Sequence, residues 1–395
     1  MKVIELAHIM AGPVCGLMLA DMGADVIKVE KPDGDDTRRF VPPAIEGESA
    51  AYMMMNRNKR GIALDLKKPQ AVAALKRLLA EADVVIENYR KGTMERLGLG
   101  YETLRELNPR LIYCEISGFG RTGPYAERGG FDLIAQGMSG LMSITGEGPG
   151  RPPVKTGAPV SDITAGILAA MGVAAAWARA LQTGQGQKVD TSLFEAAITQ
   201  TYWQSAIAFA TGVAPGPMGS AHPLNAPYQA FRTADGWINV GAANQRNWLR
   251  FLDVIGAPEL ADDPRFATNQ DRMQHLHELE EILTGYLERE TTAVWLERME
   301  AAGLPAGPVL NILEMHADPQ TQARGMIQTV EHPVAGAVKT LGHPVKYSET
   351  PAAVRRPAPL LGQHGAEVLR EAGYDEAEIE AMAATGALIL PGARG

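Results

Sequence analysis

The sequence predicts an α/β protein with a parallel sheet covered by helices, and three observations lead to this prediction. Strand-like apolar runs alternate with helix-like runs through the first third of the chain. The spacing of successive strands leaves room for the helix that a parallel connection needs. The 395 residues suffice for two or three domains at ~150 residues each, and a proline-rich stretch after residue 211 separates a second region.

The first region is expected to contain five strands, at 2–6, 25–30, 61–66, 83–87 and 111–116. Between them, a helix is expected at 14–22, closed by Gly23, and an amphipathic helix at 69–81, whose apolar residues share one face. Ligands of parallel sheets bind beyond the carboxyl ends of the strands, so residues that follow each strand are candidates for a site.

The middle of the chain holds a segment rich in glycine and proline, 118–160, which we expect to be largely irregular and functional. The apolar run 163–177 is shorter than the ~20 residues that a bilayer requires, so we interpret it as a buried helix. A strand at 188–190 and a helix at 193–209 follow.

The second region is typical of a small α+β domain. A strand is expected at 237–240, and helices are expected at 248–255, 274–286 and 292–302. A second stretch spaced by proline and glycine, 305–351, is expected to lead the chain back to the first domain. Two short helices, 365–372 and 375–384, close the chain.

Composition excludes several function classes. The chain carries 46 acidic and 37 basic side chains, and its net charge of −9 argues against nonspecific binding to nucleic acid. Two cysteines cannot form a disulfide framework or a four-cysteine zinc site, and we expect no metal centre. The N-terminal segment is broken too early by Glu5 and Pro13 for a signal peptide, so we expect a cytoplasmic protein.

Asp162 is the sharpest candidate for chemistry. It heads the apolar helix, where the helix dipole and free backbone N–H groups are expected to stabilise its anion, as a carboxylate nucleophile requires. The alternative is that Asp162 or Ser161 only caps the helix.

The glycine-rich segment and a scatter of cations are weaker signals. Gly118, Gly120 and Gly123 match the dinucleotide fingerprint formally, but Pro124 follows and no helix opens there, so nicotinamide binding is not supported. Cations that follow the predicted strands are candidates for phosphate contacts, with a solvated surface as the alternative; they include Lys31, Lys67, Arg90 and Arg96.

Several motifs occur together in a fixed order along almost the whole chain. They are Ala11–Pro13, Leu19–Glu30, Asn56–Arg60, Glu87–Gly92, Gly184–Asp190, His222–Pro223 with Ala226–Tyr228, and Pro359–Gly362. With these motifs the chain resembles the family III CoA-transferases, the family that includes formyl-CoA transferase and a carnitine CoA-transferase.

The resemblance implies a fold and an assembly. It implies a large Rossmann-like, CoA-binding domain from 1–210 with 345–395, a small domain from 225–320, and linkers at 211–224 and 321–344. It also implies an interlocked, ring-like homodimer. The substrates implied are a coenzyme A thioester and a carboxylic acid, with no permanently bound cofactor and no nucleic-acid or membrane partner.

The resemblance also implies site residues. Asp162 matches the family's nucleophile, and the positions that match CoA contacts are His8, Ile9, Met10, Ala11, Lys31, Leu64, Lys67, Asn88, Tyr89 and Arg96. Asp132 is a candidate second carboxylate. Gly129 replaces a lysine of formyl-CoA transferase, and 218–222 lacks that enzyme's run of glycines, so the acids are left open; Asn225, Gln229 and Arg232 are weak candidates to orient an acceptor.

The function expected is acyl-CoA:carboxylate CoA transfer through aspartyl anhydride and aspartyl-CoA thioester intermediates. The first alternative is an epimerase of the alpha-methylacyl-CoA racemase type, a relative that uses a histidine where this chain has Phe131. A phenyl ring cannot carry a proton, which favours the transferase. The second alternative is a CoA-binding protein without catalytic activity.

Overall fold

The computed structural model describes residues 1–392 and divides the chain into two compact units. Unit 1 comprises Met1–Leu141, Thr156–Gln200 and Pro319–Gly395, and unit 2 comprises Met142–Lys155 and Thr201–Asp318. The domain boundaries implied by the family resemblance stay a prediction. The segment 321–344, expected to be a linker, contains a regular hairpin of strands β12 (Ile327–His332) and β13 (Gly336–Leu341).

Unit 1 is built on a seven-stranded sheet in the order β14-β5-β2-β1-β6-β7-β8. The strands are β1 (Lys2–Glu5), β2 (Asp25–Glu30), β5 (Lys59–Leu64), β6 (Val84–Glu87), β7 (Ile112–Ser117), β8 (Lys188–Ser192) and β14 (Leu388–Ile389). Six strands are parallel, and only β14 pairs antiparallel, on β5. The sheet confirms the predicted α/β fold.

The strand order changes direction beside β1. The chain runs from β1 outward through β2 to β5, then returns to β6 on the other side of β1 and continues outward to β8. In open parallel sheets this switch point opens a crevice at the carboxyl ends of the two strands. The residues that follow β1 and β6 therefore face a common space.

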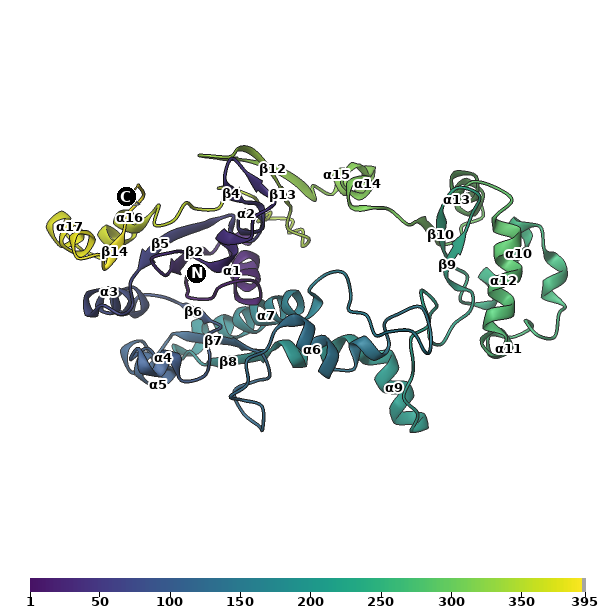
Figure 1. Cartoon of the computed structure of the whole chain (residues 1–395), viewed down its shortest axis with the longest axis horizontal. Helices are drawn as coiled ribbons and strands as arrows, with labels where there is room; N and C mark the ends of the chain where they lie inside the picture. The colour runs from purple at the N-terminus through teal and green to yellow at the C-terminus, as the bar shows by residue number, and fades with distance from the viewer. Residues whose placement is uncertain (393–395) are drawn as a thin grey trace. The chain divides into compact units, whose positions relative to one another are not determined.

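Helices cover both faces of this sheet (Figure 1). Successive residues of β1 point to opposite faces, so Val3 belongs to one buried apolar cluster and Ile4 to the other. The Val3 face is covered by α1 (Ala11–Asp21), α7 (Val160–Thr183) and α8 (Leu193–Ile198). The Ile4 face is covered by α3 (Pro69–Ala80), α5 (Tyr101–Leu107), α16 (Gly365–Glu371) and α17 (Glu376–Ala384).

Helix α7 packs unusually close to α1, side by side in Figure 1. A Cβ on Gly166 would lie 2.6 Å from the carbonyl oxygen of Ala11 and 2.7 Å from Val14. Only glycine permits this approach. Asp162 lies one turn earlier, at the i−4 position, so the same contact brings it toward the start of α1.

The prediction that α7 is a buried helix was wrong for one side of the helix. Its residues Ala165, Ala169 and Val173 are buried, but Ile167 and Met171 are 48% and 63% exposed. The small residues form the face that packs on α1, and the larger apolar residues face away from the core of unit 1. By length and composition alone α7 is long and apolar enough to cross a membrane, and 39% of its most apolar window is buried in the structure.

Short elements join these layers in unit 1. They are η1 (Asp36–Arg39), β3 (Ala44–Ile45), β4 (Glu48–Ser49), α2 (Ala50–Asn56), α4 (Thr93–Arg96), α6 (Asp132–Met138) and α15 (Pro319–Ala323). The 3₁₀-helix η2 (Leu141–Ser143) lies where the chain passes from unit 1 into unit 2. Helix α6 interrupts the segment 118–160 that we expected to be largely irregular. The β12–β13 hairpin packs on α2 through Tyr52, Met53 and Val338.

Unit 2 is a small α+β unit with a three-stranded antiparallel sheet in the order β11-β10-β9. Its strands are β9 (Tyr228–Arg232), β10 (Trp237–Gly241) and β11 (Ala306–Pro308). Its helices are α9 (Tyr202–Thr211), α10 (Gln245–Ile255), η4 (Pro258–Ala261), α11 (Asn269–Gln274), α12 (Leu276–Leu287), α13 (Thr292–Ala301) and α14 (Ile312–Ala317). Trp248, Phe251 and Leu283 lie at the centre of its core.

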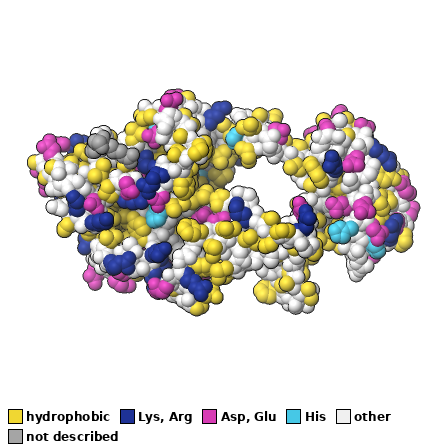
Figure 2. All heavy atoms as spheres, viewed as in Figure 1, with side chains coloured by type: hydrophobic (Ala, Val, Ile, Leu, Met, Phe, Trp, Pro, Cys, Tyr) yellow, Lys and Arg dark blue, Asp and Glu magenta, His cyan; other side chains and the backbone are white. Residues whose placement is uncertain are grey.

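The single helix expected at 193–209 is interrupted. The β-branched residues Ile198, Thr199 and Thr201 lie at the break, where the 3₁₀-helix η3 (Thr199–Thr201) separates α8 from α9. The hydroxyl of Thr199 donates to the carbonyl of Ala196, a local bond that competes with a continuous helix. Helix α9 exposes large apolar side chains, visible in Figure 2; they are Tyr202, Trp203 and Phe209.

We predict that Gly166→Ala lowers the thermal unfolding midpoint, because the added methyl overlaps a backbone carbonyl that cannot move cheaply. Overpacking of this kind costs about 1–3 kcal/mol. The matched control is Gly285→Ala in α12, where a Cβ meets nothing within 4 Å and a small gain in stability is expected. Circular dichroism melts of both variants check this, and an unchanged midpoint for Gly166→Ala would contradict the close packing.

Candidate functional site

The site lies at the switch point, where the chain leaves β1 and β6. The backbone N–H of His8 donates to Oδ1 of Asn88 at 3.0 Å, and Nδ2 of Asn88 donates back to the carbonyl of His8 at 2.8 Å. The His8 and Tyr89 rings pack with their centroids 5.6 Å apart. These contacts join the two segments that sequence analysis assigned to CoA binding.

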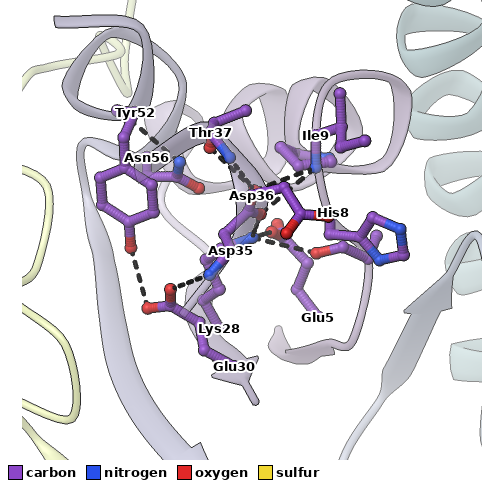
Figure 3. Close-up of polar contacts among 12 residues, drawn as sticks. Glu5, His8, Ile9, Lys28, Glu30, Asp35, Asp36, Thr37, Tyr52 and Asn56 are labelled. Atoms are coloured by element: carbon purple, nitrogen blue, oxygen red, sulfur yellow. Dashed lines mark hydrogen bonds and ion pairs between the residues drawn. The ribbon is translucent and has the colours of Figure 1, made fainter. Parts of the chain in front are cut away.

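The turn after β1 is strained. Ile9 has φ +67°, a left-handed conformation that a β-branched residue rarely adopts and that costs about 1–3 kcal/mol. Figure 3 shows how the turn is held: the Ile9 N–H points at the carboxylate of Asp35, 3.3 Å from each oxygen. Strain of this kind marks a segment whose shape matters for function.

Buried charges support Asp35 from below. Lys28 is fully buried, and its Nζ lies 2.9 Å from Asp35 and 3.1 Å from Glu5. Burial alone would raise the pKa of Asp35, but the Lys28 ammonium and the hydrogen bonds from Thr37 outweigh it, so the pKa lies well below its ordinary value. Lys59 pairs with Glu5 at 2.8 Å, and burial lowers its pKa to about 8. The turn therefore rests on a buried cluster of ion pairs.

Two glycine segments cross beside this turn. A Cβ on Gly118 would lie 2.7 Å from Cα of Gly130, and one on Gly130 would lie 2.6 Å from Cα of Gly118. These glycines are needed for contact between two backbones, in addition to the close approach to a ligand that the sequence suggested. The next side chain, Phe131, is 70% exposed and lines a cavity together with Asp162.

Asp132 accepts hydrogen bonds from two elements. Its Oδ1 accepts the backbone N–H of Ser161 at the start of α7 at 2.9 Å, and its Oδ2 accepts Nε2 of Gln136 at 2.7 Å. Gln136 is fully buried, and its Oε1 accepts the backbone N–H of Thr156 at 3.0 Å. Asp132 therefore holds the glycine-rich loop on the N-terminus of α7.

The expectation that the helix N-terminus stabilises the Asp162 anion was wrong. Asp132 accepts the Ser161 N–H, and no side chain caps α7 from Ser161 or Asp162. Burial, and then the nearby charge of Asp132, raises the pKa of Asp162 to about 7. Within residues 1–392 the Asp162 carboxyl makes no hydrogen bond, so it is free to react with a ligand.

A cavity of about 180 Å³ brings the main candidates together. Asp162 lines it with the turn at 8–11, with Asn88 and Tyr89, and with the glycine loop at 126–131. Arg90, Lys91, Arg121 and Arg128 also line it. A crevice with several cations and one free carboxyl suits an anionic ligand that carries a group to be attacked.

The other predicted CoA contacts lie outside this cavity and stay predictions. Lys31 lines an adjoining cavity with His8 and Tyr89, and its ammonium lies 2.8 Å from Asp36. Leu64 is buried in the core and paired with β14, while Lys67 and Arg96 are exposed on the surface of unit 1. Asn225, Gln229 and Arg232 lie in unit 2, where Arg232 is 3.5 Å from Glu288.

Sequence reasoning missed Arg121. Its Nη2 lies 2.7 Å from Oε1 of Glu87 at the end of β6, and its Nε lies 3.4 Å from Glu115 on β7. Burial raises the pKa of Glu87 to about 7 despite this pair. Arg121 follows an irregular glycine turn, so no periodic pattern in the sequence could have placed it between two strands.

A crevice at a switch point, a strained turn and a carboxyl with a perturbed pKa are features of an enzyme centre. Comparison of the chain with known protein families agrees with this interpretation. A family model described as CoA-transferase family III matches residues 1–365. The chain belongs to this family, and it is therefore an enzyme of the CoA-transferase class.

Relatives and solved structures are similar along nearly the whole chain. The succinate–glutarate CoA-transferase of Agrobacterium fabrum is 44% identical, over 94% of this chain and 94% of the relative. The human succinyl-CoA:glutarate CoA-transferase is 38% identical, over 98% of this chain and 88% of the relative. The crystal structure of a CaiB/BaiF family protein from Brucella suis is 40% identical with a TM-score of 0.84, over 94% of this chain and 98% of that one.

We predict that Asp162→Asn makes the protein more stable at pH 8.5 and that the gain shrinks at pH 5. The folded pKa of about 7 lies above the ordinary value of 3.8, so the wild-type protein loses stability as pH rises through this window. The isosteric amide never ionises and escapes that loss, which amounts to about 1.4 kcal/mol for each pKa unit before solvent screening. Thermal melts at both pH values measure it, and an equal gain at pH 5 and 8.5 would contradict the raised pKa.

Proposed function

We propose that this chain moves CoA from a donor acyl-CoA to an acceptor carboxylic acid through covalent intermediates on Asp162. The observation that carries the proposal is the position of Asp162: a partly buried carboxyl without a hydrogen bond, in one cavity with the turn at 8–11 and with Asn88 and Tyr89. A carboxylate with a raised pKa is a better nucleophile once ionised, and at pH 7 a substantial fraction of Asp162 is ionised.

The proposed reaction needs only carboxylates and the CoA thiol. The Asp162 carboxylate attacks the thioester carbonyl, and CoA thiolate leaves, which gives a mixed anhydride. The thiolate then attacks the aspartyl carbonyl, the donor acid leaves as its carboxylate, and an aspartyl-CoA thioester remains. The acceptor carboxylate repeats these two steps in reverse, which restores Asp162. No proton or water is consumed, so the thioester energy is conserved.

Residues around Asp162 have proposed supporting roles. Backbone N–H groups of the glycine loop at 129–131 are the proposed oxyanion donors, and exclusion of bulk water from the cavity protects the anhydride. Asp132, whose hydrogen bonds to Ser161 and Gln136 use both oxygens, positions the loop and keeps the Asp162 pKa high. The proposed CoA contacts are the ten positions implied by the family resemblance.

We propose dicarboxylic acids as the donor and acceptor class. The two curated relatives described above are named for succinate and glutarate, and both acids carry a second carboxylate. Four cationic side chains line the cavity with Asp162, which suits a substrate with an additional negative charge.

We further propose a homodimer located in the cytoplasm. The exposed apolar side chains of α7 and α9, among them Met171 and Phe209, support an assembly that covers them. A coenzyme A thioester is the proposed substrate, with no permanently bound cofactor.

We predict that Asp162→Ala lowers CoA transfer from succinyl-CoA to glutarate by at least a thousandfold, because no other carboxyl in the cavity is free to form the anhydride. Formation of glutaryl-CoA, followed by chromatography, measures it. Glu127→Gln, which removes the other carboxylate that lines the cavity, is the comparison variant and is expected to retain transfer.

Two results would contradict the proposal. One is substantial turnover by Asp162→Ala. The other is wild-type enzyme that transfers nothing but exchanges the acyl α-proton with deuterated water, which would assign the chain to the racemase branch.

A further inference from the structure

The four cationic side chains that line the Asp162 cavity differ in whether they have a partner within the protein. Lys91 lies 3.0 Å from Glu127, and Arg121 is held by Glu87 and Glu115. The guanidinium of Arg128 lies 4.1 Å from the centroid of the Tyr125 ring. Among residues 1–392, Arg90 alone of the four cations has no hydrogen bond, ion pair or aromatic partner for its side chain.

The Arg90 side chain lines the cavity and approaches the glycine loop. Its Nη2 lies 3.9 Å from the point where a Cβ on Gly129 would stand. Gly129 presents no side chain here, and the guanidinium of Arg90, which follows β6, lies in the space beside it. The positive charge beside Gly129 therefore comes from Arg90, which is distant from Gly129 in the sequence and has no carboxylate partner among the described residues.

Contacts on both sides hold the backbone of Arg90. Asn88 and Tyr89 immediately precede it, and both are fixed against the His8 turn. The Arg90 carbonyl accepts the N–H of Thr93, which closes the turn into α4. A flexible side chain on a fixed backbone can follow a ligand while its base stays in register with the reacting atoms.

We propose that Arg90 binds the distal carboxylate of the acyl group and so selects dicarboxylic over monocarboxylic acyl-CoA substrates. The inference rests on the proposed function. The substrate's near carboxyl carbon reacts with Asp162, and its far carboxylate needs a cation that no protein carboxylate neutralises. Arg90 meets this requirement, and a planar guanidinium can bind a carboxylate through two hydrogen bonds.

The competing cations fit this role less well. Arg121 and Lys91 would have to give up a carboxylate partner at 2.7 Å and 3.0 Å. Arg128 would have to leave the face of Tyr125. Within the described part of the chain, Arg90 has no such contact to break, so the full interaction is available to the ligand.

The test is a binding experiment that needs no turnover. In an Asp162→Ala background, calorimetry compares glutaryl-CoA with pentanoyl-CoA, which has the same chain length but no distal carboxylate. We expect Arg90→Gln to weaken glutaryl-CoA binding at least tenfold and to leave pentanoyl-CoA within twofold. Gly129→Glu, which places a carboxylate beside Arg90, should have the same selective effect.

The controls separate the alternatives. Arg110→Gln, an exposed arginine outside the cavity, should change neither affinity. Equal weakening of both ligands by Arg90→Gln would show that Arg90 contacts the CoA moiety, and selective weakening by Arg128→Gln alone would assign the role to Arg128; either result overturns the proposal, as would no effect. Because the readout is binding, a selective effect supports the assignment even if wild-type enzyme fails to transfer CoA.

Discussion

The close contact between α7 and α1 is the constraint on which the site depends. Because residue 166 is glycine, α7 settles against the Ala11 carbonyl. That contact sets the position of Asp162, which lies one helical turn before Gly166, relative to the strained segment at 8–11. A larger residue at 166 would push the helices apart and move the carboxyl from the segment that is proposed to hold the thioester. Asp132 completes the arrangement by tying the glycine loop to the first turn of α7. Position in this site is thus fixed by backbone contacts, which hold more precisely than long side chains.

Electrostatics then divides the two carboxyls into different roles. Asp132 accepts two hydrogen bonds, one of them from a helix N-terminus, whereas Asp162 has none and is desolvated. Burial, and then the nearby charge of Asp132, therefore raises the pKa of Asp162. The buried ions beneath Ile9 follow the opposite logic. Lys28 and Lys59 with Glu5 and Asp35 form a cluster of two cations and two carboxylates that supports the turn. The cavity therefore combines a rigid wall with a carboxyl whose charge is easily changed.

Much of the fold and of the candidate site could be predicted from the sequence. The remaining features could not be predicted, for physical reasons. The strands of the first region follow directly from short apolar runs, and residues after β1 and β6 became candidates because ligands bind at strand ends. The family resemblance supplied the CoA contacts at those positions and matched Asp162 to a nucleophile. The capping of α7 by Asp132 could not be seen, because its partners lie 29 residues apart in a segment without periodicity. The Ile9–Asp35 contact and the exposed face of α7 escaped for a similar reason: both depend on tertiary packing, which the local pattern does not encode. The β14 addition to the sheet rests on only two residues, too short a run to recognise as a strand.

The central claim is that Asp162 forms a covalent bond with the substrate, and intact-mass spectrometry tests it most directly. The protein is incubated with succinyl-CoA, quenched, digested and mapped, with and without hydroxylamine. The account predicts an acyl or CoA adduct on the peptide that contains Asp162, removed by hydroxylamine because anhydrides and thioesters react with it. An adduct confined to another peptide, or an unmodified protein that still transfers CoA, would contradict it.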